Sequence, residues 1–188
     1  MLPTEYAQYI AFLRAINVGG HTVKMEHLRR LFEAMGHSNV ETFIASGNVI
    51  FDSTSKSAQA LEKKIAAHLH ASLGYEVATF IRTPSELAAI AQYKPFSNAE
   101  LNAEGNTLYI GFLPDNPSDA AKKKLLACTT KSDDFHINGR EVYWLCRKLF
   151  SESEFSGKEL EKVLGMPATL RNSTTAKKIA AKYSRGIL

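Results

Sequence analysis

The residues best placed to do chemistry follow a predicted buried strand near the start of the chain. Residues 9–20 read YIAFLRAINVGG, and Arg14 is the one charged residue in this run. A strand that ends at Asn17 and a pair of glycines, with a helical pattern close behind, forms a junction where backbone amides can point at an anion. The groups that would face a phosphate are Gly19, Gly20, Thr22 and Lys24. The alternative is that the two glycines only let the chain turn.

Arg14 carries the charge inside this apolar run. Strand alternation predicts that it lies on the same face as Ile10, Phe12 and Ile16. Burying an unpaired guanidinium costs several kcal/mol, so a carboxylate, backbone carbonyls or a ligand must lie beside it unless the sheet meets water there. A structural ion pair and a ligand contact are both open interpretations.

A second candidate anion site lies near the C-terminus. We expect Asn172 or Ser173 to cap the last helix, with Arg171 beside its amino end. One face of this helix carries Lys178, Lys182 and Arg185. Residues 167–188 hold five of the 23 basic residues and none of the 19 acidic ones. This segregated charge favours a polyanionic partner, with nucleic acid as one candidate, and the alternative is an amphipathic helix with a solvated basic face.

The sequence contains no pattern typical of a catalytic or metal site. The six histidines lack zinc spacing, and the HExxH, GxSxG, GxGxxG and GxxxxGK[ST] patterns do not occur. Asp133 and Asp134 are adjacent, so on a strand they point to opposite faces and make a poor acid and base pair. Cys128 and Cys146 do not form a disulfide framework or a CxxC pair. We therefore assign no catalytic residue and expect no metal and no cofactor.

The elements that position the first candidate site alternate between strands and helices. Hydrophobic spacing and turn residues predict a strand from Tyr9, a helix at 24–35, strands at 40–45 and 49–51, a helix at 57–73, a strand at 76–82 and a short helix after Thr83. Ser46-Gly47-Asn48 is typical of a tight hairpin turn. We count Ser46 and Asn48 among the candidate ligand-binding residues.

The second half is predicted to repeat this order. Its strands are expected at 106–113, 134–137, 141–146 and 168–171, with helices after Asn116 and Ser156 and a basic helix at about 173–183. The polar segment 96–105 predicts a division into residues 1–95 and 96–188, although a boundary near Thr83 is also open. The two halves show no convincing residue-level repeat. The order predicts an α+β protein of two ferredoxin-like β-α-β-β-α-β subdomains with antiparallel sheets, followed by a basic C-terminal helix.

Three segments carry a resemblance to a known family. They are FLRAINVGG at 12–20 with the following Lys24-Met25 helix start, SGNVIF at 46–51, and residues 168–175. In these segments the chain resembles the bacterial family called domain of unknown function 1697, and the resemblance covers nearly the whole chain. It implies two ferredoxin-like subdomains in one chain and no particular activity. The family tends to have an aromatic residue where this chain has Ser173, so no stacking role is expected at that position.

These observations support hypotheses from different classes. The first is a non-enzymatic module that binds a phosphate-containing ligand through Arg14, Asn17, Gly19, Gly20 and Lys24, together with Arg171 and the tail lysines. The second is a small-molecule enzyme whose anionic substrate is clamped between the subdomains by Arg14 and Arg171. A structural or partner-binding role is a third. The chain lacks a secretion pattern and an apolar run of about 18 residues, so we expect a cytoplasmic protein with no membrane partner. The oligomeric state is left open.

Overall fold

The computed structural model describes residues 5–17 and 19–184 of the 188-residue chain. The chain divides into two compact units, residues 1–86 and 87–188, and each is described by itself. This division falls inside helix α3 (Pro84–Gln92). The sequence-based boundary after residue 95, with its alternative near Thr83, stays a prediction.

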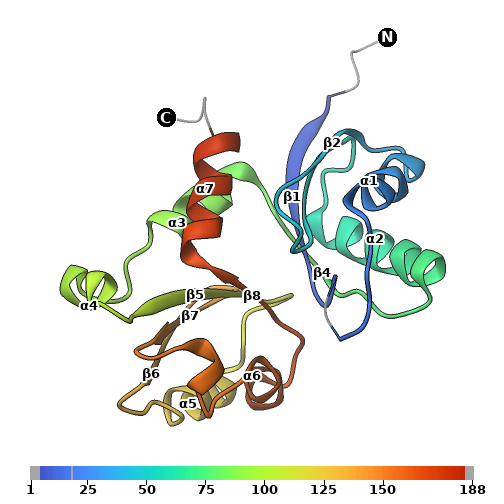
Figure 1. Cartoon of the computed structure of the whole chain (residues 1–188). Helices are drawn as coiled ribbons and strands as arrows, with labels where there is room; N and C mark the ends of the chain where they lie inside the picture. The colour runs from blue at the N-terminus through green and yellow to red at the C-terminus, as the bar shows by residue number, and fades with distance from the viewer. Residues whose placement is uncertain (1–4, 18, 185–188) are drawn as a thin grey trace. The chain divides into compact units, whose positions relative to one another are not determined.

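The first unit is a four-stranded antiparallel sheet with two helices on one face (Figure 1). Its elements are β1 (Ala7–Leu13), α1 (Met25–Ala34), β2 (Ser38–Thr42), β3 (Asn48–Ser53), α2 (Ala58–Leu73) and β4 (Thr79–Arg82). The strand order is β2-β3-β1-β4. Two crossing helices and this order are the ferredoxin-like arrangement that the sequence predicted.

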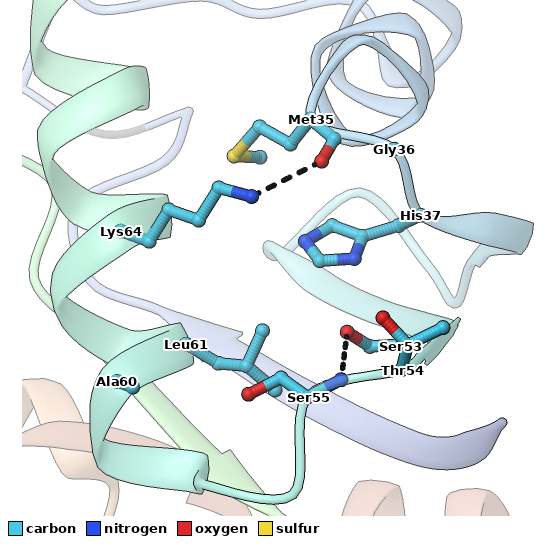
Figure 2. Close-up of a pocket in the computed structure, with 9 residues that line it drawn as sticks. All are labelled: Met35, Gly36, His37, Ser53, Thr54, Ser55, Ala60, Leu61 and Lys64. Carbon is cyan, nitrogen blue, oxygen red and sulfur yellow. Dashed lines mark hydrogen bonds between the residues drawn. The ribbon is translucent and has the colours of Figure 1, made fainter. Parts of the chain in front are cut away.

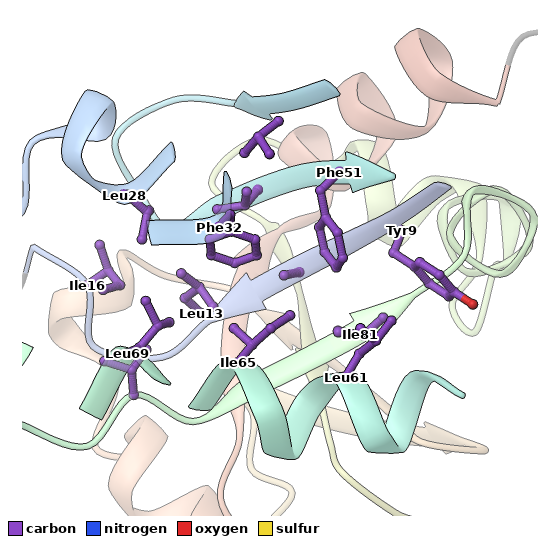
Figure 3. Close-up of a cluster of buried hydrophobic side chains, with 14 of the residues drawn as sticks. Tyr9, Leu13, Ile16, Leu28, Phe32, Phe51, Leu61, Ile65, Leu69 and Ile81 are labelled. Carbon is purple, nitrogen blue, oxygen red and sulfur yellow. The ribbon is translucent and has the colours of Figure 1, made fainter. Parts of the chain in front are cut away.

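The core of the first unit lies between β1 and the two helices (Figure 3). Strand alternation turns Tyr9, Ala11 and Leu13 toward the helices, where they meet the apolar face of each. The apolar residues of α2 recur every four positions, because Leu61, Ile65 and Leu69 are all buried. Ser57 caps the start of α2 by accepting a hydrogen bond from the Ala60 amide at 3.2 Å, and Gly74 ends the helix with φ 80°.

The second unit repeats this plan. Its sheet contains β5 (Thr107–Phe112), β6 (Asp133–Asn138), β7 (Glu141–Cys146) and β8 (Thr169–Asn172) in the order β6-β7-β5-β8. The crossing helices are α5 (Asp119–Leu126) and α6 (Gly157–Leu164), and further short elements are α4 (Asn98–Asn102) and the 3-10 turn η1 (Phe150–Glu152). Helix α7 (Ser173–Tyr183) packs on β5 and β8 across the sheet from α5 and α6 (Figure 1). Both faces of this sheet are therefore covered by helices of its own unit.

A residue-level repeat links the two first strands. Residues 9–13 read YIAFL and residues 109–113 read YIGFL, at the same place in each sheet. The register shows the match: Ile10 lies opposite Arg82, and Ile110 lies opposite Arg171. The expectation that the halves share no residue-level repeat was therefore wrong. The match was missed because the helices and loops between these strands are dissimilar, so only the strand register aligns the two halves.

Several element boundaries differ from the sequence-based expectation. The segment 96–105, expected to be a linker, contains α4, whose start is closed by a capping box between Ser97 and Glu100. The second strand spans 38–42 in place of 40–45, and the fourth begins at Thr79 in place of Glu76. Asn48 was expected in a turn but is the first residue of β3 and is fully buried.

Candidate functional site

The strongest candidate site consists of two loops at one end of the first sheet. We call residues 14–24 loop A and residues 43–47 loop B; Val18 of loop A lies outside the described residues. Six residues of these loops have positive φ angles: Ala15, Asn17, Gly19, Gly20, Ile44 and Gly47. A residue other than glycine in this region costs on the order of 1–3 kcal/mol, and a β-branched residue such as Ile44 is an outlier there. Such strain tends to concentrate in functional segments.

The side chain of Asn17 joins the two loops. Its Nδ2 donates to the backbone oxygen of Ala45 at 3.2 Å, and its Oδ1 accepts from the amide of Val23 at 2.6 Å. The first bond ties loop A to loop B, and the second closes loop A on itself ahead of α1. These bonds support a positioning role for Asn17, one of the predicted site residues.

Loop B is held by its own Ser-Gly-Asn sequence. The Asn48 side chain donates to the Phe43 oxygen at 3.0 Å and to the Ser46 hydroxyl at 2.9 Å. Gly47 lies so close to β1 that a Cβ there would be 3.1 Å from the Cβ atoms of both Leu13 and Ile16. The predicted site residues Ser46 and Asn48 therefore fold loop B, and Gly47 allows it to approach loop A.

The outer part of loop A is open to solvent. Gly19, Gly20 and Lys24 are exposed, and a Cβ at either glycine would meet nothing within 4 Å. Lys24 is the N-cap of α1 and its side chain makes no capping hydrogen bond. A helix start leaves several amide donors without intrahelical partners, and they favour a negatively charged ligand. The one acidic residue of the first turn, Glu26, is already paired with Arg30.

A ring stack ties the middle of loop A to the segment before β4. The His21 and Tyr75 rings stack with centroids 3.8 Å apart and planes 20° apart. Burial raises the pKa of the Tyr75 hydroxyl, so Tyr75 stays protonated at neutral pH. The stack places an aromatic pair next to the exposed glycines.

Arg14 lies directly after the end of β1 and is half-buried. Its backbone amide donates to the Ala78 oxygen at 2.9 Å. The expectation that Arg14 shares a face with Ile16 was wrong, since Ile16 joins the helix-side cluster of Tyr9, Ala11 and Leu13. The cause is the positive φ of Ala15, 63°, which ends the strand alternation.

The second candidate site surrounds the start of α7. Arg171 is buried, and its Nη1 donates to the Thr169 hydroxyl at 2.8 Å and the Leu170 oxygen at 2.9 Å. Burial lowers the pKa of Arg171 to about 10, so the guanidinium remains charged at neutral pH. Asn172 caps α7, because its side chain accepts from the Thr174 amide at 2.8 Å. The cap predicted at 172 or 173 is thus confirmed at Asn172.

Helix α7 separates its basic and apolar residues. Lys177, Lys178 and Lys182 are exposed, while Ala176, Ile179 and Ala180 are buried. Arg185, which completes the predicted basic face, lies outside the described residues. Arg171 and Arg14 belong to different units, so the clamp that would pair them stays a prediction.

The acidic pair near the second sheet is structural. Asp133 is buried and accepts from Trp144 Nε1 and the Ser153 hydroxyl, each at 2.9 Å. Asp134 points elsewhere and accepts from Arg147 at 3.2 Å. Neighbouring strand residues therefore have separate partners, as alternation predicts. Within the described residues, no group of three or more His, Cys, Asp or Glu side chains is arranged to hold a metal ion.

Sequence reasoning missed a cavity at the opposite end of the first sheet (Figure 2). Its volume is about 260 Å³, and it is lined by Met35, Gly36, His37, Ser53, Thr54, Ser55, Ala60, Leu61 and Lys64. His37 is 6% exposed, and neither ring nitrogen has a hydrogen-bond partner in the described part of the chain. A buried polar group without a partner costs about 1–3 kcal/mol. The lining comes from three separate segments, 35–37, 53–55 and 60–64, so no single local pattern in the sequence indicates it.

Among the helices that the structure describes, none is long and apolar enough to cross a membrane.

Two ferredoxin-like units in one chain, with strained and interlocked loops at the end of the first sheet, define a tandem ferredoxin-like α+β protein. Residues 6–143 match the family model described as protein of unknown function (DUF1697), and the chain belongs to this family. The solved structure of a conserved bacterial protein from Streptococcus pneumoniae is similar, with a TM-score of 0.75 and 20% sequence identity over 96% of this chain and 100% of that one. At this identity the similarity shows the fold alone. A comparison with curated proteins gave no match.

Proposed function

We propose that this protein binds a phosphate-containing anion at loop A and acts as a non-enzymatic binding module, with nucleic acid as the first candidate ligand. One observation carries the proposal. An exposed glycine pair and an exposed lysine stand at a helix start that has no side-chain cap, on a loop that Asn17 holds in place. A cytoplasmic location is part of the same proposal.

The physical argument rests on a positive potential at a preorganised backbone. The start of a helix carries the equivalent of roughly half a positive charge, worth about 0.3–1 kcal/mol to a nearby anion at an exposed site. Lys24 adds a full charge at the same place. Because the folded chain already holds the strained loop backbone, little ordering cost remains when a ligand binds.

The basic face of α7 supports a ligand with several phosphates. Lys178 and Lys182 are exposed one helical turn apart, and the first turn of α7 carries no acidic residue. Each lysine that neutralises a phosphate releases a counterion, so binding depends on salt. In the proposal, α7 is a second phosphate contact in the second unit.

Titration with labelled single- and double-stranded oligonucleotides tests this function. We expect binding at about 50 mM salt that weakens steeply as salt rises. Lys24→Ala should weaken it about threefold, a change of roughly 0.7 kcal/mol. The matched control is Lys63→Ala, which removes an exposed lysine from α2 and should leave binding unchanged. Absence of binding at low salt, together with unmoved Gly19 and Gly20 amide signals when pyrophosphate is added, would contradict the proposal.

A second pair of variants tests the part assigned to α7. The double substitution Lys178→Ala and Lys182→Ala should reduce the slope of log affinity against log salt by about one to two units. The double control, Lys123→Ala with Lys124→Ala, removes two exposed lysines from α5 in the same unit. Equal reductions of this slope in the two double variants would show that the salt dependence follows the net charge of the protein and not the position of the lysines on α7.

A further inference from the structure

The cavity around His37 lies away from loop A. Ser53, on its wall, is opposite Ala7 in the β1–β3 register, whereas Asn48, beside loop B, is opposite Phe12. Five residue steps at about 3.3 Å place these two ends of the sheet roughly 16 Å apart. The cavity is therefore a separate site within the first unit.

His37 is the unusual group in this cavity. Its ring packs on Phe51 with centroids 4.6 Å apart, and both of its nitrogens are buried without a hydrogen-bond partner in residues 5–17 and 19–184. Figure 2 shows the ring between Lys64 and the segment Ser53–Ser55. Buried polar groups in proteins are usually paired, so a buried ring with two unpaired nitrogens beside a cavity points to a missing partner.

The charge around the cavity specifies the kind of partner. Lys64 is the charged residue of the lining, and no carboxylate is among its nine residues. Its ammonium donates to the Met35 oxygen at 3.3 Å, which uses one of three N–H groups. Thr54 and Ser55 also line this space, and the Ser55 hydroxyl bonds to the backbone of Ser57. A set of donors with a positive charge fits an anion with oxygen acceptors and repels a metal ion.

The size of the cavity limits the ligand further. Pockets for drug-sized molecules measure about 300–1,000 Å³, and this cavity of about 260 Å³ is smaller. Lys64 and Thr54 are exposed, so the cavity opens to solvent. We propose that it binds a small oxyanion, which accepts hydrogen bonds from the Lys64 ammonium and from an N–H of the His37 imidazole.

Nuclear magnetic resonance of the full chain, labelled with ¹⁵N in its histidines, tests the proposal. Inorganic phosphate and sodium acetate are titrated separately at constant ionic strength, with sodium chloride as the reference salt. We expect phosphate, acetate or both to move the His37 ring signals with saturation, whereas chloride should not. If water alone serves the ring, neither oxyanion produces a saturating shift, and the proposal fails.

Two neighbouring lysines provide a matched pair of variants. Lys64→Met should weaken oxyanion binding about tenfold, because it removes a charged donor from the wall. Lys63→Met removes the same charge from the preceding residue of α2, which is exposed and outside the lining, and should change affinity less than twofold. An equal loss of oxyanion affinity in the two variants would contradict a binding site at Lys64. His37→Gln, with its fold checked by circular dichroism, should also weaken binding, and unchanged affinity in this folded variant would remove His37 from the site.

The proposal for the cavity and the function proposed for loop A can be refuted independently of each other. Phosphate at the cavity moves the His37 ring signals, whereas phosphate at loop A moves the Gly19 and Gly20 amides. Lys24→Ala should therefore leave the affinity measured at His37 unchanged.

Discussion

The side chain of Asn17 donates a hydrogen bond to the backbone oxygen of Ala45 at 3.2 Å. Asn17 begins the Asn-Val-Gly-Gly segment, and Ala45 directly precedes Ser-Gly-Asn-Val. Two of the three segments that carry the family resemblance are therefore parts of one structure. Asn17, Gly47 and Asn48 are needed to close the two loops against each other. The exposed Gly19 and Gly20 are the residues to which the proposed function assigns the ligand.

Replacing Asn17 tests this structure. Asn17→Ala removes the bonds to Ala45 and Val23 and leaves an alanine at φ 58°, so we expect a loss of about 1–3 kcal/mol in the free energy of unfolding. Asn17→Asp keeps the oxygen that accepts from Val23 and should cost less. Urea denaturation followed by circular dichroism measures both. Unfolding free energies equal to wild type in both variants would show that the loops do not depend on this side chain.

Gly47 offers a test of close packing. Gly47→Ala places a Cβ 3.1 Å from the Cβ atoms of Leu13 and Ile16 at a φ of 75°. Gly74→Ala has a similar φ of 80° with nothing within 4 Å, so it carries the backbone cost alone. We expect Gly47→Ala to be the more destabilising by about 1–3 kcal/mol, the usual cost of overpacking. Equal thermal midpoints for the two variants would contradict this packing role.

The fold was predictable because its determinants are local. The Thr83 and Glu86 capping pair, the Ser57 cap and the glycine ends of the helices each act within a few residues. Buried strands and turn residues supplied the strand count, and this count with the helix order admits few topologies. The Asn172 cap of α7 was predicted for the same reason.

The details of the candidate sites were not predictable, since they depend on residues far apart in the chain. Asn17 was expected to face a ligand, yet its side chain forms hydrogen bonds with Val23 and Ala45. These partners follow from the packing of loop A against loop B, which no local pattern indicates. The positive φ of Ala15 has no signature in its residue type. The spacing of the histidines in the sequence bears on zinc binding alone, whereas the cavity beside His37 arises where its ring packs near Phe51 and Lys64.

Asp133 and Asp134 form a natural pair of variant and control in the second unit. Asp133→Ala leaves Trp144 Nε1 buried without its acceptor, so we expect the free energy of unfolding to fall by about 1–3 kcal/mol. Asp134→Ala removes a half-buried carboxylate that pairs with Arg147 and should cost under about 1 kcal/mol. Trp144 is the single tryptophan of the chain, so its fluorescence reports unfolding of this unit. A larger loss in Asp134→Ala would contradict the assigned roles.

Glu100 should titrate at lower pH than an ordinary glutamate. Hydrogen bonds from the Ser97 hydroxyl and amide, and then from Arg147, lower the pKa of Glu100 below 4.5. Because the folded pKa is the lower one, this carboxylate stabilises the fold above pH 4.5, and the contribution is lost as pH falls through the folded pKa. Ser97→Ala should raise the pKa more than Arg147→Gln does. The carbon chemical shift of the Glu100 carboxyl group, followed over a pH series, gives the pKa in each variant. A larger rise in Arg147→Gln than in Ser97→Ala would contradict this prediction, because the ion pair would then have the larger effect on the pKa.

His37 should make the first unit less stable in mild acid. Burial, and then the charge of Lys64 on α2, lower the pKa of His37 below 6.5. The rings of Phe32 and Phe51, which pack on it from α1 and β3, carry no charge. Between the folded pKa and 6.5 the unfolded chain binds a proton that the folded chain does not, so stability falls as pH is lowered through this window and is unaffected above it.

The variant His37→Gln isolates this effect from the other five histidines. Its free energy of unfolding should fall less than that of wild type between neutral pH and mild acid, whereas His70→Gln, at an exposed position on α2, should follow the wild-type curve. Urea denaturation by circular dichroism at a series of pH values gives the comparison. A negative charge beside the imidazole favours its protonated form and raises its pKa toward the ordinary value. A bound oxyanion should therefore reduce the difference in stability loss between wild type and His37→Gln in mild acid. If wild type and His37→Gln lose stability in parallel, the buried imidazole does not titrate in this window.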